Sequence, residues 1–68
     1  MRLYCPQWCH RRKGWIDLPM LADKKEHVAI KTAEEFANTH QVSTRTIRKP
    51  QGWKPEDSKY QLPTPEDK

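Results

Sequence analysis

Apolar residues occur along the chain in short groups, and their spacing predicts different elements in different segments. In residues 17–27 the apolar positions are three and four residues apart, as on one face of an α-helix. Asp17 is a suitable N-cap and Pro19 is tolerated in a first turn, so we predict a helix over this segment. The run Val-Ala-Ile at residues 28–30 is typical of a short strand or a linker.

The strongest helical signal lies in residues 32–48. Thr32 and Glu35 form the T-x-x-E pattern of a capping box, which predicts that a helix begins at Thr32. A turn follows at His-Gln, and Ser43 is a second N-cap that predicts a short second helix. Pro50 ends this helix, because the residue before a proline is pushed out of the α region.

The two ends of the chain lack this helical spacing. We expect residues 1–16 to form an extended arm or a hairpin, with Gly14 available for a positive φ in a basic turn. Residues 53–62 predict a β-hairpin, because Gly-Trp and Tyr-Gln-Leu flank the turn sequence Lys-Pro-Glu-Asp-Ser. We expect residues 64–68 to form a frayed tail. The predicted fold is therefore mainly α with a small β-hairpin.

The length of 68 residues corresponds to a single small domain with a thin core. A large catalytic cleft is not expected in so small a core. No apolar run is long enough for a transmembrane helix, and residues 1–8 lack the apolar stretch of a secretory signal. We expect Trp8, Trp15 and Trp53 to pack in the core, since three large rings help to close it.

Charge is distributed unevenly along the chain. The net charge is +4, and residues 1–31 hold seven basic and three acidic residues. The last fifteen residues hold three basic and four acidic ones. A basic front half fits contact with a polyanion, although a solvated surface of mixed sign has the same composition.

Catalytic and metal chemistry are poorly indicated. Cys5 and Cys9 form C-x3-C next to His10, and a zinc site would need His27 or His40 as a further ligand. We expect ordinary reduced thiols and no metal or other cofactor. The acidic pairs are adjacent in sequence and point apart, so paired-carboxylate catalysis is not indicated, and we predict that the protein is not an enzyme.

The pattern of residues 32–48 favours a helix-turn-helix that binds DNA. Apolar residues would pack the two helices together and leave Thr44, Arg45 and Arg48 facing outward, where a major groove could receive them. Arginine donates two hydrogen bonds to guanine, and the amides at Ser43 could hold a phosphate.

The segment TAEEFANTHQVSTRTIR resembles the helix-turn-helix of phage and mobile-element DNA-binding proteins. The following KPQGWKPEDSKYQLP resembles the wing of the excisionase-type (MerR-like) winged helix. The resemblance covers roughly residues 30–63 and implies a supporting helix over 32–38, a recognition helix over 43–48 and a wing over 53–62. We therefore expect a winged helix-turn-helix domain over residues 17–63. The resemblance also implies cooperative binding that bends DNA.

We therefore expect a sequence-specific protein for double-stranded DNA, either an excisionase-like directionality factor or a small phage-type transcriptional regulator. It would bind as a dimer, as several adjacent copies or with a partner protein, in the cytoplasm of a bacterial host at the nucleoid. The predicted DNA contacts are Ser43, Thr44, Arg45, Thr46, Arg48 and Lys49 in the recognition segment, Lys54 and Lys59 in the wing, and Arg11, Arg12 and Lys13 in the basic turn.

Two other functions remain open at this point. The chain could be an inhibitor or adaptor from a mobile element that binds a host protein through its Trp-rich first 16 residues and its Pro-rich tail. It could also be a metal-dependent mini-domain.

Overall fold

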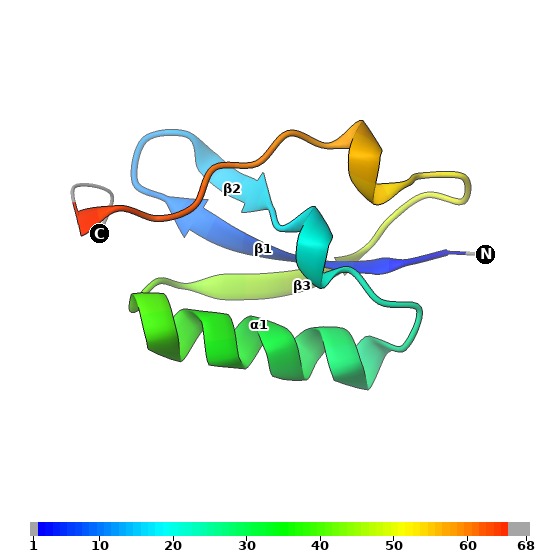
Figure 1. Cartoon of the computed structure of the whole chain (residues 1–68), viewed down its shortest axis with the longest axis horizontal. Coiled ribbons are helices and arrows are strands. Elements are labelled where there is room, and N and C mark those ends of the chain that lie inside the picture. The colour runs from blue at the N-terminus through cyan, green and yellow to red at the C-terminus, as the bar shows by residue number, and fades with distance from the viewer. Residues whose placement is uncertain (1, 66–68) are drawn as a thin grey trace.

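The computed structural model describes residues 2–65 and contains one long helix packed on a three-stranded antiparallel sheet (Figure 1). The strands are β1 (Tyr4–His10), β2 (Gly14–Asp17) and β3 (Thr44–Arg48). The helix is α1 (Glu26–His40), and two single-turn 3-10 helices, η1 (Pro19–Leu21) and η2 (Pro55–Asp57), lie in the connections. The predicted mainly α fold, a winged helix-turn-helix, is therefore wrong.

Strand β1 is the centre of the sheet, whose order is β2-β1-β3. It pairs with β2 through a tight turn and with β3 across most of the chain length, for example Trp8 with both Ile16 and Thr44. Gly14 has a φ of 80° at the end of the turn, as the sequence predicts. The first residues therefore form a hairpin that supplies two of the three strands.

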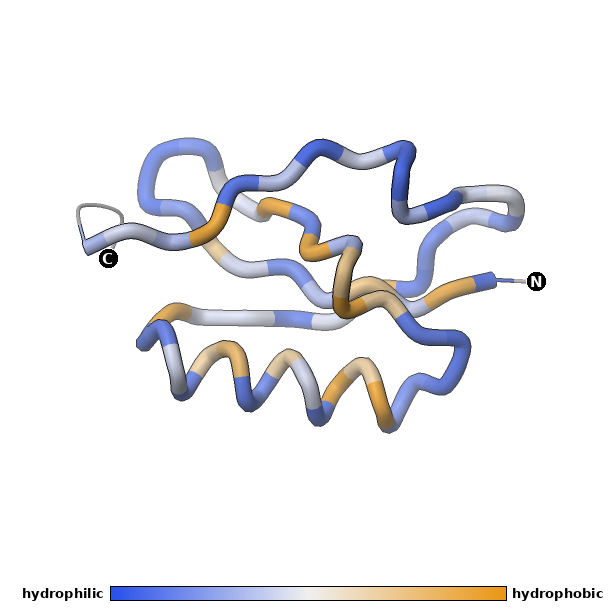
Figure 2. Tube along the Cα trace, in the orientation of Figure 1, coloured by the Kyte–Doolittle hydropathy of each residue, from blue (hydrophilic) through white to orange (hydrophobic). Residues whose placement is uncertain are grey.

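Most of the core lies between the sheet and α1, and the buried Cys5 lies on the other face of β1. Successive side chains of a strand point to opposite faces, so Pro6 and Trp8 share the face that α1 covers. Trp8 and Leu18 are fully buried, and Ala29 and Ala33 bring α1 close to the sheet. The indole nitrogen of Trp8 donates a hydrogen bond to the carbonyl of Gln61 at 2.8 Å, which ties the C-terminal segment to the core. Figure 2 shows apolar positions interspersed with polar ones along α1.

Pro6 lies in the central strand, where a proline would normally remove a ladder hydrogen bond. Its carbonyl accepts from the amide of Leu18 at 2.9 Å, so its backbone faces the β2 side of the sheet. Strand β2 ends at Asp17, so the missing N–H falls just beyond the paired part of that strand. The proline therefore leaves the pairing of β1 with β3 intact.

The predicted recognition helix over residues 43–48 is wrong, because Thr44–Arg48 is strand β3. The sequence TRTIR is rich in β-branched residues, which favour strands, and it pairs with Tyr4–Trp8. The hydroxyl of Thr44 donates to the carbonyl of Ala33 at 3.2 Å, which fixes the strand against α1. Partners about forty residues away in sequence thus outweigh the local N-cap signal at Ser43.

The first predicted helix boundaries are also wrong. Residues 17–27 divide into the end of β2, the turn η1 and the start of α1. Residues 28–30, predicted as a strand or linker, lie inside α1. Thr32 does not cap the helix, because its hydroxyl donates to the carbonyls of Val28 and Ala29 at 3.1 and 3.0 Å within the helix.

The predicted wing over residues 53–62 is not a β-hairpin. In the part of that segment which the structure describes, Pro55–Asp57 is a 3-10 turn and the remaining residues lie outside any strand. The indole of Trp53 donates to the hydroxyl of Ser58 at 3.1 Å and closes this loop on itself. Of the predicted frayed tail 64–68, residues 66–68 lie outside the described residues.

Helix α1 ends at a strained position. Gln41 has φ 55° and ψ 49°, in the left-handed region, and the amide of Val42 donates to the carbonyl of Ala37 at 3.2 Å. This reversal directs the chain from α1 into β3. Glycine adopts such a conformation without the steric cost that a side chain carries.

We therefore predict that Gln41→Gly stabilises the fold by about 1 kcal/mol, because it removes the left-handed strain of a residue with a side chain. Chemical denaturation monitored by circular dichroism measures this change. Glu34→Gly, at an exposed position inside α1, is the matched control and should destabilise the fold by about 1 kcal/mol. A loss of stability in both variants would contradict the strain at Gln41.

Candidate nucleic-acid interface

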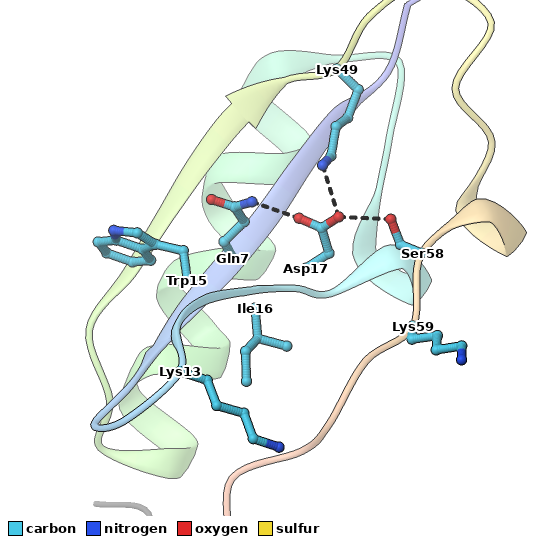
Figure 3. Close-up of a pocket in the computed structure, with 8 residues that line it drawn as sticks. All are labelled: Gln7, Lys13, Trp15, Ile16, Asp17, Lys49, Ser58 and Lys59. Carbon is cyan, nitrogen blue, oxygen red and sulfur yellow. Dashed lines mark hydrogen bonds and ion pairs between the residues drawn. The ribbon is translucent and has the colours of Figure 1, made fainter.

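The sheet face opposite α1 carries a row of polar side chains across all three strands. Gln7 of β1 is paired with Asp17 of β2 on one side and with Arg45 of β3 on the other. Because directly opposite residues in a sheet point to the same face, the three side chains lie side by side. Figure 3 shows Gln7 and Asp17 in front of the sheet, with the ribbon of α1 behind it.

These side chains are joined by short hydrogen bonds. The Nε2 amide of Gln7 donates to Oδ1 of Asp17 at 2.6 Å. The Nε of Arg45 donates to Oε1 of Gln7 at 2.8 Å. Gln7 is buried, so its amide is held between the carboxylate and the guanidinium rather than exchanging with water.

Asp17 is the anchor of this row. Its second oxygen, Oδ2, accepts from Lys49 Nζ and from Ser58 Oγ, each at 2.7 Å (Figure 3). The side chains of Asp17 and Lys49 are 15% and 14% exposed, so the ion pair is partly withdrawn from water. Burial alone would raise the pKa of Asp17, but the hydrogen bonds from Gln7, Lys49 and Ser58 outweigh it and hold the pKa below its usual value.

Arg45 is held on its other side by an aromatic ring. Its Cζ atom lies 4.3 Å from the centroid of the Trp15 ring, a cation–π contact. Trp15 is 40% exposed, so the expectation that all three tryptophans pack in the core is wrong for this residue. In residues 2–65 the guanidinium makes no hydrogen bond except the one to Gln7, so both η nitrogens are available to a ligand.

We call the sheet face opposite α1, which carries Gln7, Asp17 and Arg45, the open face. Basic residues surround it. The turn between β1 and β2 exposes Arg11, Arg12 and Lys13. Nδ1 of the buried His10 accepts from the amides of Arg12 and Lys13 at 3.0 and 3.2 Å, which gives this turn a fixed shape. The Lys13 ammonium also donates to Oε1 of Gln61 at 2.7 Å.

A groove of about 530 Å³ lies between this face and the C-terminal segment. Lysine is its commonest lining residue, and Asp17 is its one acidic lining residue among those described. Its lining residues are Gln7, Lys13, Trp15, Ile16, Asp17, Lys49, Ser58 and Lys59 (Figure 3).

The structure brings only some of the predicted site residues together. Arg45, Lys49, Lys13 and Lys59 lie on or beside the open face. The other members of the predicted recognition segment do not point there. Thr44, Thr46 and Arg48 project from the face of the sheet on which α1 lies, since strand side chains alternate.

The remaining predicted contacts are dispersed. Ser43 precedes β3 and its carbonyl accepts from the amide of Cys9 at 2.9 Å, so it continues the backbone bonding of β3 to β1 rather than capping a helix. Lys54 is exposed at the start of η2. Four residues of the polar row and its supports were missed by sequence reasoning: Gln7, Trp15, Asp17 and Ser58. If Gly14–Asp17 and Thr44–Arg48 had been read as strands, the alternation of side-chain direction would have placed Trp15 with Asp17 on one face of the sheet. It would also have separated Arg45 from Thr44 and Thr46.

The cysteines and histidines do not form a metal cluster within the described residues. Cys5 is buried and Cys9 is exposed, and they form no disulfide. Burial, followed by the negative charge of Asp17, raises the pKa of the Cys5 thiol. His10 lies on the opposite face of β1 from both thiols. In residues 2–65, no helix has the length and apolar character needed to cross a membrane.

Neither the family models nor the curated proteins and solved structures include a match to this chain.

We predict that the network around Asp17 makes stability depend on pH. Because the pKa of Asp17 is lowered in the folded protein, its contribution is complete above about pH 4, the usual aspartate pKa, and is lost as pH falls through the lowered value. Asp17→Asn should lower the free energy of unfolding at neutral pH and weaken its dependence on pH below about pH 4.

Urea denaturation at a series of acidic pH values measures this dependence. Glu34→Gln, which removes an exposed carboxylate of α1, is the control. If Asp17→Asn left the pH dependence of the free energy of unfolding unchanged at acidic pH, the charge of Asp17 would not stabilise the polar row.

Proposed function

We propose that this protein binds double-stranded DNA through the open face of its sheet. The observation that carries the proposal is the arrangement of Arg45, which is held between Trp15 and Gln7 with both η nitrogens unbonded within the described residues. An arginine fixed in this way pays little rotamer entropy on binding.

Charge supports the same partner. The chain carries a net charge of +4, and three exposed basic residues lie in the turn at one end of the open face. Lys59 borders the groove on the side of the C-terminal segment. Basic groups at the margins of a face place phosphates around it, and the face itself then meets the base edges.

The shape of the sheet fits a duplex. The backbones of β2 and β3 are two strand spacings apart, about 10 Å, and the major groove of B-DNA is about 12 Å wide. Sheets and β-ribbons enter this groove in other DNA-binding proteins. An unpaired base would instead stack on an open aromatic ring, but the guanidinium of Arg45 already covers one face of Trp15.

We expect the protein to bind a random-sequence duplex at low salt and to release it as salt rises, because phosphate contacts displace counterions. On a duplex selected from random sequences for tight binding, Arg45→Ala should weaken binding by about 1–3 kcal/mol. Fluorescence anisotropy with a labelled duplex, measured at low and at physiological salt, gives both quantities.

Arg48→Ala is the matched control, because it removes the same charge from the same strand on the other face. Its effect should be small and confined to the general electrostatic attraction. Equal losses in the two variants would assign the binding to net charge alone, and an absence of binding at low salt would overturn the proposal.

A second candidate is a host-protein inhibitor or adaptor, which the exposed apolar side chains of the C-terminal segment favour. Tyr60 and Leu62 are 54% and 48% exposed. Tyr60 lines a second, smaller groove with Ile16, and large apolar side chains at such a surface are typical of protein contacts. Binding to a protein would leave Arg45→Ala without effect and would depend on Tyr60.

A further inference from the structure

We infer that Arg45 recognises guanine in the major groove, and that Gln7 and Asp17 are positioning residues that set the plane of its guanidinium. This inference rests on the proposed DNA-binding function and specifies the base that the open face takes. It follows from which atoms of Arg45 the protein occupies and which it leaves unbonded.

The occupied atom of Arg45 is Nε. It donates to Oε1 of Gln7, and within residues 2–65 the two η nitrogens have no hydrogen-bond partner. Two parallel N–H groups in one plane match the O6 and N7 acceptors of guanine. Adenine offers only one acceptor in that place, beside a donor that would oppose the guanidinium.

The orientation of the Gln7 amide is dictated by its neighbours. Asp17 accepts only, so the amide nitrogen of Gln7 faces Asp17 and the amide oxygen faces Arg45. The carboxylate is in turn held by Lys49 and by Ser58. A chain of hydrogen bonds therefore runs from the loop after β3 across the sheet to the guanidinium.

Trp15 restricts the remaining freedom of Arg45. The ring lies against the guanidinium at 4.3 Å from its centroid, so rotation about the side chain would lose the cation–π contact. The guanidinium is thus fixed by a hydrogen bond at one edge and by a ring on one face. A guanidinium fixed in one plane is prepared for a bidentate contact with the edge of a planar base.

The test uses two duplexes of identical sequence, one with guanine and one with 7-deazaguanine at each guanine position. The replacement removes the N7 acceptor and keeps base pairing and charge. We expect the native protein to bind the guanine duplex about tenfold more tightly, the ratio that one hydrogen bond from a charged donor to N7 supports. Arg45→Met should bind both duplexes equally, since methionine keeps much of the length of the side chain but donates no hydrogen bond to N7 or O6.

Arg48→Met is the matched control for this variant and should keep the preference, because it removes the same charge and Arg48 projects from the opposite face. The ratio of two affinities measured on one protein sample also cancels any fraction of unfolded protein. A variant that folds less well therefore still reports on guanine preference.

The positioning role is tested with Gln7→Met and Asp17→Asn. Both should lower the guanine preference, the ratio of the two affinities, severalfold. A merely structural role would lower both affinities by the same factor and leave their ratio unchanged.

Each result has one meaning. If the native protein binds neither duplex, the proposed DNA-binding function is wrong. If it binds both equally, DNA binding stands and recognition of guanine through N7 is overturned. If Arg45→Met loses the preference while Gln7→Met and Asp17→Asn keep it, Arg45 recognises guanine without the help of Gln7 and Asp17.

Discussion

The fold depends on the burial of Trp8 in the central strand. This residue is fully buried, and it pairs through its backbone with Ile16 of β2 and Thr44 of β3. Its ring fills the space between the sheet and α1, and its indole nitrogen is bonded to the C-terminal segment. In a chain of 68 residues a single buried indole supplies a large part of the available apolar burial. The small residues Ala29 and Ala33 allow the helix to approach it closely.

Because one face of the sheet is used for this core, the other face can be polar. A partly buried carboxylate would normally favour its neutral form, but Asp17 receives three hydrogen bonds and keeps its charge. The charge of Asp17 then orders Gln7, and Gln7 orders Arg45. Burial of the Asp17 carboxylate costs desolvation free energy. The hydrogen bonds that offset this cost also fix the position of Arg45 at the surface.

Local signals in the sequence predicted only part of this arrangement. A helix through the segment around Phe36 and a turn at Gly14 are both present, since each depends on neighbouring residues. The segment Thr44–Arg48 was predicted as a helix because Ser43 has the chemistry of an N-cap and Pro50 that of a helix stop. Its strand form depends on pairing with Tyr4–Trp8, which no local pattern reveals. The left-handed conformation of Gln41, which makes that pairing accessible, occurs at a residue type that does not signal it.

The same long-range pairing determines which residues form the candidate site. Arg45 was singled out from the sequence for its charge, but its partners Gln7 and Asp17 come from two other strands and are found only once the register is known. A slip of one residue in β3 would turn Arg45 toward the helix and expose Thr44 and Thr46 instead. The hydrogen bonds from Thr44 to α1 and from Cys9 to Ser43 oppose that slip. The contacts that hold β3 in register against the core are therefore also the contacts that keep Arg45 on the open face, so the stability of the fold and the geometry of the site are maintained together.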